Sequence, residues 1–333
     1  MLHIMAHESI TIRVPAKLNL YLEVGLLQED GYHDMETAYQ AVSLYDTLNI
    51  SRHESTGAHG LTISVCGTDC ERIPRNGDNI VIKAARLLFS YAGIQADGHF
   101  ELTKSIPVEA GLGGGSADAA AALVGCNTLW KTGLNDQELS ALAFRLGEDV
   151  PFFVKGLLAV GCRRSRFLRS LEVKDYIWTW VLGIPSKRLS TRKVYSHFDT
   201  LLKKRADWDE AAYRSRLDQY RQVAWGSTRP EDLAAMGVLV NSLENVASDL
   251  EPEVGVALEA GRRTSALATV LGGTGSSCCF LVRDETNARL LIAELQKEAV
   301  FDDLILVRGP VGGAECLDAI QGAGLFKQVE DEH

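Results

Sequence analysis

A glycine-rich segment is the part of the chain whose residue types most directly indicate chemistry. Residues 107–117 read P-V-E-A-G-L-G-G-G-S-A, and the alanine-rich run 118–124 follows at once. Glycines lack a Cβ, so this stretch can bend sharply and bring backbone N–H groups close to a ligand. The helix expected from about Ser116 adds free N–H donors and the positive end of its dipole, which favour an anion. The segment therefore predicts a phosphate-binding loop, with a flexible turn before a packed helix as the alternative.

The loop departs from the two common nucleotide-binding patterns. A Walker loop has Lys and Ser/Thr after its last glycine, whereas Ser116 is followed here by Ala117 and Asp118. A dinucleotide fingerprint counted from Gly111 would need a glycine where Ser116 stands. A phosphate held by this loop would therefore need a cation from another part of the chain.

Three further clusters contain side chains suited to that chemistry. Lys17 lies in an apolar, strand-like stretch, where an ammonium costs free energy unless it meets an anion or a carboxylate. The alternative is that Lys17 lies on the solvent-exposed face of an edge strand. Asp149 precedes an apolar segment that is expected to form a strand beginning at Pro151. Its carboxylate either caps a turn or lies near a reacting hydroxyl. Residues 30–33, D-G-Y-H, predict a hairpin tip whose two rings pack locally or stack on a base.

Length and composition limit the class of protein. The 333 residues suggest two domains, and 46% hydrophobic with 23% charged residues is ordinary for a globular chain. The net charge of −10 argues against nucleic acid as the main partner. The seven cysteines show no pattern of metal ligands or disulfides. With no apolar run long enough to span a bilayer and no secretory signal, a cytoplasmic protein without a membrane partner is expected.

The elements that must position these clusters can be read from periodicity. A first half of short strands is expected to lead into a helix that begins at Asn79 and ends at Gly93, followed by a strand feeding the glycine loop. A buried helix is expected over 117–130, and Asn135 with Glu138 predicts a capping box for the next. The second half then alternates strands and helices in the order strand-helix-strand-strand-helix-strand, with a second glycine turn at 272–275. This order predicts an α+β sandwich.

Four passages of the chain stand out together: PAKLNLYLEV with DGYH (15–33), NIVIKAARLL (79–88), IPVEAGLGGGSADAAAAL (106–123) and LGEDVPFFVKG (146–156). In their order and spacing they resemble the GHMP kinase superfamily. A looser match continues through LSTRKVY (189–195), NSLENVA (241–247) and GGTGSSCCF (272–280). The resemblance is strongest to members that act on a cytidine diphosphate derivative in the non-mevalonate isoprenoid pathway.

The resemblance implies a two-domain fold. The expected N-terminal domain (1–165) is like the second domain of ribosomal protein S5 and contains the glycine-rich ATP loop. The expected C-terminal domain (166–333) is a ferredoxin-like α/β sandwich. The implied activity is ATP- and Mg²⁺-dependent phosphorylation of the 2-hydroxyl of 4-diphosphocytidyl-2-C-methyl-D-erythritol by a monomer or homodimer. The alternatives are a kinase of the homoserine or mevalonate type and a non-catalytic ligand sensor on the same fold.

The resemblance also implies roles for single residues. Asp149 would orient the acceptor hydroxyl and take its proton, while Lys17 would stabilise charge on the phosphoryl group; such positioning and electrostatics suffice for phosphoryl transfer. Ser116 is the candidate Mg²⁺ ligand, and the rings of Tyr32, His33 and Tyr195 would bracket the cytosine. The implied ATP-site residues are Asn79, Lys104, Pro107, Val108, Glu109, Ala110, Gly111, Leu112, Gly113, Gly114, Gly115, Ser116 and Ala117. The implied acceptor-site residues are Asn19, Tyr32, His33, Asp149, Thr191, Tyr195, Gly273 and Thr274.

One passage departs from the superfamily pattern. After Gly156 a small-residue strand normally enters a tight turn with glycines and an acid, but here Arg163, Arg164, Arg166 and Arg169 fall within seven residues. An altered surface turn is one reading, because surface loops tolerate change. A cationic patch beside a diphosphate substrate and a locally compensated frameshift are the other two.

Overall fold

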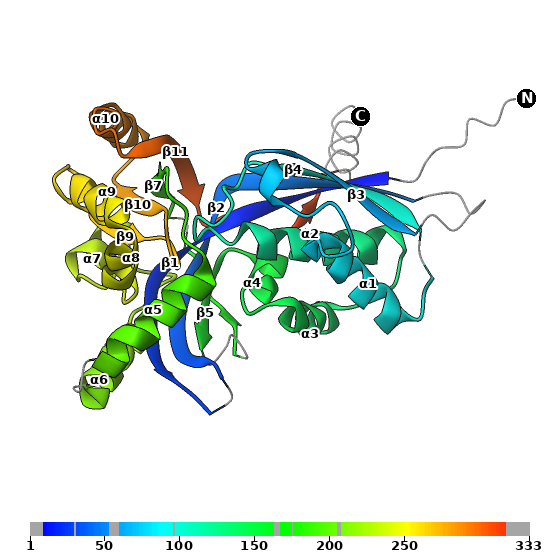
Figure 1. Ribbon diagram of the computed structural model, residues 1–333, viewed down its shortest axis with the longest axis horizontal. Coiled ribbons are helices and arrows are strands. Elements are labelled where there is room, and N and C mark those ends of the chain that lie inside the picture. Colours follow the sequence, from blue (N-terminus) through cyan, green and yellow to red (C-terminus); the bar gives the residue numbers. More distant parts are fainter. Residues whose placement is uncertain are drawn as a thin grey trace, which may run out of the picture.

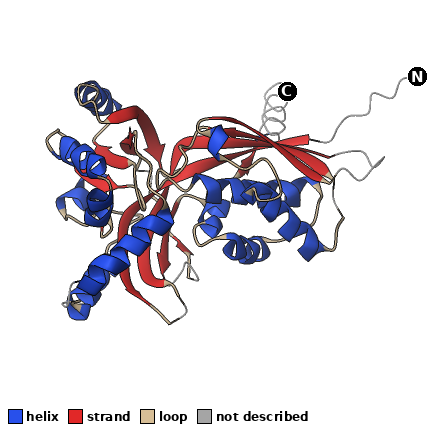
Figure 2. Cartoon of the chain, viewed as in Figure 1, coloured by secondary structure: helices blue, strands red, loops and turns tan. Residues whose placement is uncertain are grey.

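The computed structural model describes residues 9–29, 31–52, 60–95, 97–162, 167–174, 176–204 and 208–317. Two long antiparallel strands, β1 (Ser9–Leu27) and β2 (His33–Arg52), run through the molecule and connect its two lobes (Figure 1). The chain folds into two sheets with separate sets of helices (Figure 2). The predicted α+β class is confirmed. None of the helices in these described ranges has the length and apolarity needed to cross a membrane.

The first sheet is built around β1 and β2. Its strands follow the order β12-β1-β2-β4-β3, while β5 pairs with β2, β6 with β5, and β8 with β1. Because β8 and β12 come from the second half of the sequence, both halves contribute strands to this sheet. The additional strands are β3 (Leu61–Gly67), β4 (Gly98–Lys104), β5 (Leu158–Cys162), β6 (Arg169–Ser170), β8 (Val240–Asn241) and β12 (Glu315–Cys316).

Four α-helices pack together against the first sheet (Figure 2). The central one, α2 (Gly114–Leu129), contacts β1 and β2, and its alanines are buried around the helix as its uniformly apolar sequence predicts. The capping box predicted for Asn135 and Glu138 is present at α3 (Asp136–Leu146). The remaining elements of this lobe are the short 3₁₀ helix η1 (Cys70–Arg72), α1 (Ile80–Ala92) and α4 (Val150–Lys155).

The second sheet has the order β11-β7-β10-β9, and all its pairs are antiparallel. Counted along the chain, this is the order 4-1-3-2 with helices after the first and third strands, which is the ferredoxin-like arrangement expected from the sequence. The strands are β7 (Trp178–Pro185), β9 (Ala268–Leu271), β10 (Cys278–Val282) and β11 (Phe301–Gly309). The helices of this half are α5 (Thr191–Lys204), α6 (Glu210–Arg221), α7 (Pro230–Ala235), α8 (Glu244–Leu250), α9 (Pro252–Arg262) and α10 (Glu285–Leu295).

One local prediction was wrong, and one strand was missed. The segment after Asp149 is the helix α4 and not a strand, because Pro151 fits the first turn of a helix, where its missing N–H is not needed. The stretch 33–46 was not predicted as a strand, yet it forms the first part of β2. Its polar residues are tolerated there because several of their side chains bond to partners in neighbouring elements. The proposed domain boundary at 165/166 falls within 163–166, outside the described residues, and stays a prediction.

Candidate active site

A cavity of about 640 Å³ lies where the glycine loop, β1 and the second glycine turn meet. It is lined by Lys17 and Asn19 of β1, by the loop itself, by Asp149, and by Thr191 and Tyr195 of α5. All residues predicted for the nucleotide and acceptor sites line this cavity except Tyr32, His33 and Ala117. Ala117 is fully buried in α2 behind the loop.

The glycine loop has the conformation that its sequence predicts. Gly111 and Gly113 have φ of 79° and 76°, in the left-handed region, and Gly113 caps the N-terminus of α2. A Cβ on Gly111 would lie 1.8 Å from the Gly272 carbonyl oxygen, so only glycine fits. At Gly115 a Cβ would meet nothing within 4 Å, so this glycine faces open space. The loop is thus packed on one side and open on the other, at a helix N-terminus that favours phosphate.

The second glycine turn braces the loop from the other half of the chain. The Ser277 side chain donates to the Ala110 carbonyl at 2.6 Å, and its backbone N–H donates to the same oxygen at 3.1 Å. The turn is itself held by Asn241, whose amide donates to the carbonyls of Leu271 and Gly273 at 2.9 and 2.6 Å. Contacts between the two lobes therefore fix the position of the loop.

Lys17 and Asp149 form a loose ion pair in the wall of the cavity. The Lys17 ammonium lies 3.9 Å from Asp149 Oδ2 and donates to Asn19 Oδ1 at 2.6 Å. The Tyr39 hydroxyl donates to Asp149 Oδ1 at 2.9 Å, and the Tyr39 ring stacks on Phe152 of α4 at 5.1 Å. These contacts hold both charged groups in the cavity wall without a close hydrogen-bonded ion pair between them.

Burial shapes the chemistry of Lys17. The residue is 4% exposed, so the wet edge-strand alternative is wrong. Its backbone N–H donates to the Leu112 carbonyl at 3.0 Å, which links β1 directly to the glycine loop. Burial lowers the pKa of the Lys17 ammonium, and the nearby Asp149 carboxylate partly opposes that shift. An anion entering the cavity would relieve the desolvation cost of the ammonium.

A second buried lysine, Lys104, lies in a charged cluster beside the glycine loop. Lys104 at the end of β4 donates to Asp118 Oδ2 at 2.7 Å and to Asp46 Oδ2. Burial disfavours the charged Lys104, but the two carboxylates more than offset it, so the pKa of Lys104 is raised. Asp46 Oδ1 also accepts the backbone N–H groups of Ser105 and Ile106, at 2.6 and 2.9 Å. The cluster fixes the segment that leads into the loop.

Asn79 lines the cavity, but its polar atoms serve the fold. Its Oδ1 accepts from the Val81 N–H at 2.9 Å and its Nδ2 donates to the Pro74 carbonyl at 2.7 Å. Asn79 therefore caps α1 and forms part of the cavity wall. It would contribute to a nucleotide site by shaping that wall, since both its amide groups are already bonded within the fold.

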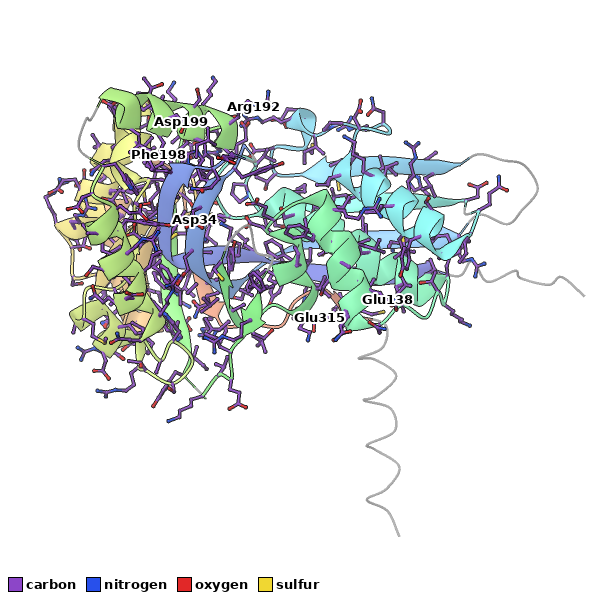
Figure 3. All side chains as sticks on the ribbon, turned by 90° about the horizontal axis from the view of Figure 1, so that it is seen from below. Asp34, Glu138, Arg192, Phe198, Asp199 and Glu315 are labelled. Carbon is purple, nitrogen blue, oxygen red and sulfur yellow. The ribbon has the colours of Figure 1, made fainter. Side chains whose placement is uncertain are left out.

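At the opposite end of the cavity, α5 approaches the tip of the β1–β2 arm. His33 stacks on Tyr195 with ring centroids 5.2 Å apart, and its Nε2 lies 3.3 Å from Asp199 Oδ1. Figure 3 shows Phe198 and Asp199 on α5 beside the arm that bears Asp34. Tyr32 is 47% exposed. Because His33 and Tyr195 touch, bracketing of a base by these rings stays a prediction that requires the pair to separate.

Several residues of the site were not found from the sequence. Tyr39 lies in the unpredicted part of β2, so its alignment with Asp149 could not be anticipated. Asp118 is a single acid inside an otherwise apolar helix, and that contrast was a usable signal of a buried partner. Asn241 begins the passage NSLENVA that resembles the superfamily, but no role was predicted for it.

The arginine-rich segment 163–169, which departs from the superfamily pattern, is only partly within the described residues. Arg163, Arg164 and Arg166 lie outside the described residues, as does the proposed turn. Arg169 is an exposed residue of β6 and does not line the main cavity. The three interpretations of this segment remain open.

The fold and the site define a class of phosphotransferase, and comparison with known proteins agrees with it. Residues 79–157 match the family described as "GHMP kinases N terminal domain", and residues 227–300 match "GHMP kinases C terminal". The chain belongs to the GHMP kinase superfamily.

Particular relatives narrow the class. A protein of Salinispora arenicola named 4-diphosphocytidyl-2-C-methyl-D-erythritol kinase is 36% identical over 303 residues, 91% of this chain and 93% of that protein. A crystal structure of 4-(cytidine 5'-diphospho)-2C-methyl-D-erythritol kinase has a TM-score of 0.67 and 27% identity, with 90% of this chain and 98% of that one covered. A homoserine kinase from Cytophaga hutchinsonii, with a TM-score of 0.71 but 15% identity over 95% of this chain and 100% of that one, shares the fold alone.

Proposed function

We propose that this protein transfers the γ-phosphoryl group of ATP to the 2-hydroxyl of 4-diphosphocytidyl-2-C-methyl-D-erythritol. The observation that carries the proposal is the pairing of Lys17 with Asp149 opposite a glycine loop, in a chain whose relatives at 36% identity bear the name of that kinase. The charged pair also supports a kinase over a non-catalytic sensor, which would have no need of it.

In the proposed reaction Asp149 is the general base. Its carboxylate is held by the Tyr39 hydroxyl and is 31% exposed, so an acceptor hydroxyl can reach it from the cavity. Asp149 orients that hydroxyl in line with the γ-phosphorus and receives its proton as the new P–O bond forms. The bond to the leaving oxygen of ADP breaks in the same step, without a phospho-enzyme.

Lys17 supplies the fixed positive charge. Its ammonium is held by Asn19, which in turn donates from Nδ2 to the Thr37 hydroxyl at 2.8 Å. A preorganised cation in a largely dry site stabilises charge on the transferring phosphoryl group more than a mobile one in water would. The backbone N–H groups at the start of α2 would hold the neighbouring phosphate oxygens.

The residues at the loop fit a Mg²⁺ ion that arrives with ATP. Mg²⁺ retains several waters and takes few protein ligands when phosphates supply the rest. The described residues contain no cluster of three or more His, Cys, Asp or Glu that could hold a metal alone. Ser116 lines the cavity in the first turn of α2, beside the open face at Gly115. We propose that the Ser116 hydroxyl holds the ion, which would neutralise charge on the phosphates.

The experiment is coupled detection of ADP release with a panel of acceptors. We expect turnover with 4-diphosphocytidyl-2-C-methyl-D-erythritol and none above background with homoserine or mevalonate. Asp149→Asn should lower kcat by at least about 10³-fold, since it removes the base while leaving shape unchanged. Turnover of a different acceptor, or near-normal kcat in that variant, would contradict the proposal. The cytoplasmic location and the monomer or homodimer remain predictions from the sequence.

A further inference from the structure

The hydrogen bonds around Asn19 have a fixed direction that starts at β2. The Thr37 hydroxyl donates to the Tyr21 carbonyl at 2.5 Å, where the register of β1 and β2 shifts between Asn19 and Tyr21. A hydroxyl has one proton, and that proton is used, so the Thr37 oxygen can only accept from Asn19 Nδ2, 2.8 Å away. The other end of the amide, Asn19 Oδ1, is thereby turned toward the Lys17 ammonium at 2.6 Å.

These groups are shielded from water. Lys17, Asn19 and Thr37 are 4%, 5% and 1% exposed. Buried polar groups keep their hydrogen-bond partners, because an unpaired one costs free energy. Thr37 does not line the cavity, whereas Lys17 and Asn19 do. The threonine is therefore placed to act on the site through the asparagine amide.

A reversed Asn19 amide would suit a neutral Lys17. Its NH₂ group would then face Lys17 Nζ and could donate to the lone pair of an uncharged amine, whereas an ammonium has only donors and needs the oxygen. Thr37 opposes this reversal. The amide oxygen would meet a hydroxyl oxygen whose proton is already used, or the bond to the Tyr21 carbonyl would be lost. The observed orientation of the amide therefore favours the charged lysine.

We propose that Thr37 is a positioning residue, which fixes the Asn19 amide with its oxygen toward Lys17 and thereby keeps this lysine charged for phosphoryl transfer. The proposal rests on the role of Lys17 in the proposed function and specifies how its charge is maintained. A dipole that is already oriented stabilises charge without reorganising during the reaction.

Other titratable groups also face Lys17. Asp149 at the start of α4 lies 3.9 Å away and favours the ammonium, while Glu148 lines the same cavity. The ammonium lies 6.0 Å from the centroid of the Tyr39 ring on β2. The Cys279 thiol of β10 is also near, and burial raises its pKa to about 12, so it stays neutral below that pH. A change on the far side of the amide leaves all of these groups in place.

The first test follows the protonation of Lys17 directly, without nucleotide or acceptor. Protein labelled with ¹³C at the lysine ε-carbon is titrated by NMR from about pH 6 to about pH 11, and the Lys17 signal is assigned by its loss in Lys17→Arg. Thr37→Val keeps a similar shape but lacks the hydroxyl. The midpoint of the Lys17 titration should fall by about one pH unit, from the loss of the hydrogen bond that orients the amide. Thr37→Ala removes the same hydroxyl and should give the same shift.

Two variants serve as controls. Thr37→Ser keeps the hydroxyl and should keep the Lys17 midpoint within about 0.3 pH units. Thr47→Val makes the matched substitution on the same strand, but Thr47 pairs with Thr103 of β4 and does not line the cavity. It should leave the midpoint unchanged.

The second test is the pH profile of kcat, measured by ADP release with the proposed acceptor. In Thr37→Val the alkaline limb of kcat should move to lower pH by the same amount as the midpoint. KM for ATP near pH 7 should stay within about twofold, because the lysine is still charged there. A merely structural role would lower kcat at every pH without moving the limb.

An unchanged Lys17 midpoint in both Thr37→Val and Thr37→Ala would overturn the assignment. An equal shift in Thr37→Ser or in Thr47→Val would also overturn it, because the effect would then not come from the hydroxyl. The NMR titration uses neither ATP nor acceptor, so its result is separate from the proposed function. A shifted midpoint without turnover of the cytidine diphosphate acceptor would refute only that function.

Discussion

Replacing Tyr39 by phenylalanine removes one atom from the site and tests how the base is held. The Tyr39 hydroxyl donates to Asp149 Oδ1 at 2.9 Å, while its ring stacks on Phe152. Tyr39→Phe keeps the ring and its packing, so the fold should be little affected. The loss that bears on catalysis is the hydrogen bond from this hydroxyl to the Asp149 carboxylate.

The magnitude follows from the exposure of the carboxylate. A hydrogen bond to a charged group contributes about 1.5–3 kcal/mol, and the upper values apply where water cannot replace it. The Asp149 side chain is 31% exposed, so water can partly substitute for the hydroxyl. We therefore take about 1.5 kcal/mol, which corresponds to roughly a tenfold fall in kcat. KM for ATP should stay within about twofold, because binding of the nucleotide does not use this contact.

The assay is ADP release at saturating ATP with 4-diphosphocytidyl-2-C-methyl-D-erythritol as acceptor. Tyr45→Phe is the matched control, since Tyr45 lies on the same strand but faces Arg13, with 4.4 Å between the guanidinium carbon and the ring centroid. Thermal unfolding of both variants shows whether the fold is retained. An unchanged kcat in Tyr39→Phe, or an equal loss in Tyr45→Phe, would refute the argument that Tyr39 positions the base.

Three further outcomes are expected. Because burial lowers the pKa of Lys17 from its usual 10.5, kcat should fall on the alkaline side before pH 10.5. In the unfolded chain Lys17 keeps its proton up to a higher pH than in the folded protein. The free energy of unfolding should therefore rise as the pH increases from the folded pKa of Lys17 to 10.5, and denaturant unfolding at a series of pH values checks this sign. Gly111→Ala should lower the free energy of unfolding in urea by about 3 kcal/mol, because its Cβ clashes with the Gly272 carbonyl and its φ is positive. Gly115→Ala should unfold like the unaltered protein but bind ATP more weakly, because its Cβ projects into open space at the loop. Removal of divalent ions with EDTA should abolish ADP release, and excess Mg²⁺ should restore it; EDTA-resistant turnover would refute the role given to Ser116.

The charged pair illustrates how far local patterns reach. An ammonium inside an apolar stretch indicated that Lys17 meets an anion, and its burial agrees with that. The distance from Lys17 to Asp149 could not be predicted, because it depends on how β1 and α4 pack across α2. A strand was expected after Asp149, whereas a helix is present. The prediction failed because an apolar run of five residues is too short to show the period of either element.

A turn followed by a helix was already specified by the amino-acid sequence at the glycine loop, although α2 begins at Gly114 and not near Ser116. Residues without Cβ atoms, followed by a strongly helix-forming run, specify a turn and a helix start through local sterics alone. Helix caps at Asn79 and Asn135 follow from contacts two or three residues apart. Such interactions are encoded within short segments, so they can be recognised without knowledge of the rest of the chain.

Tertiary structure decided what the loop faces. The bond from Ser277 to Ala110 and the bond from the Tyr39 hydroxyl to Asp149 join residues 167 and 110 positions apart. No local pattern encodes such pairings, because they depend on the relative placement of two sheets and the helices packed on them. The sequence therefore specified a glycine turn that leads into a helix, and the packing of the two lobes placed Lys17 and Asp149 in the same cavity as that turn.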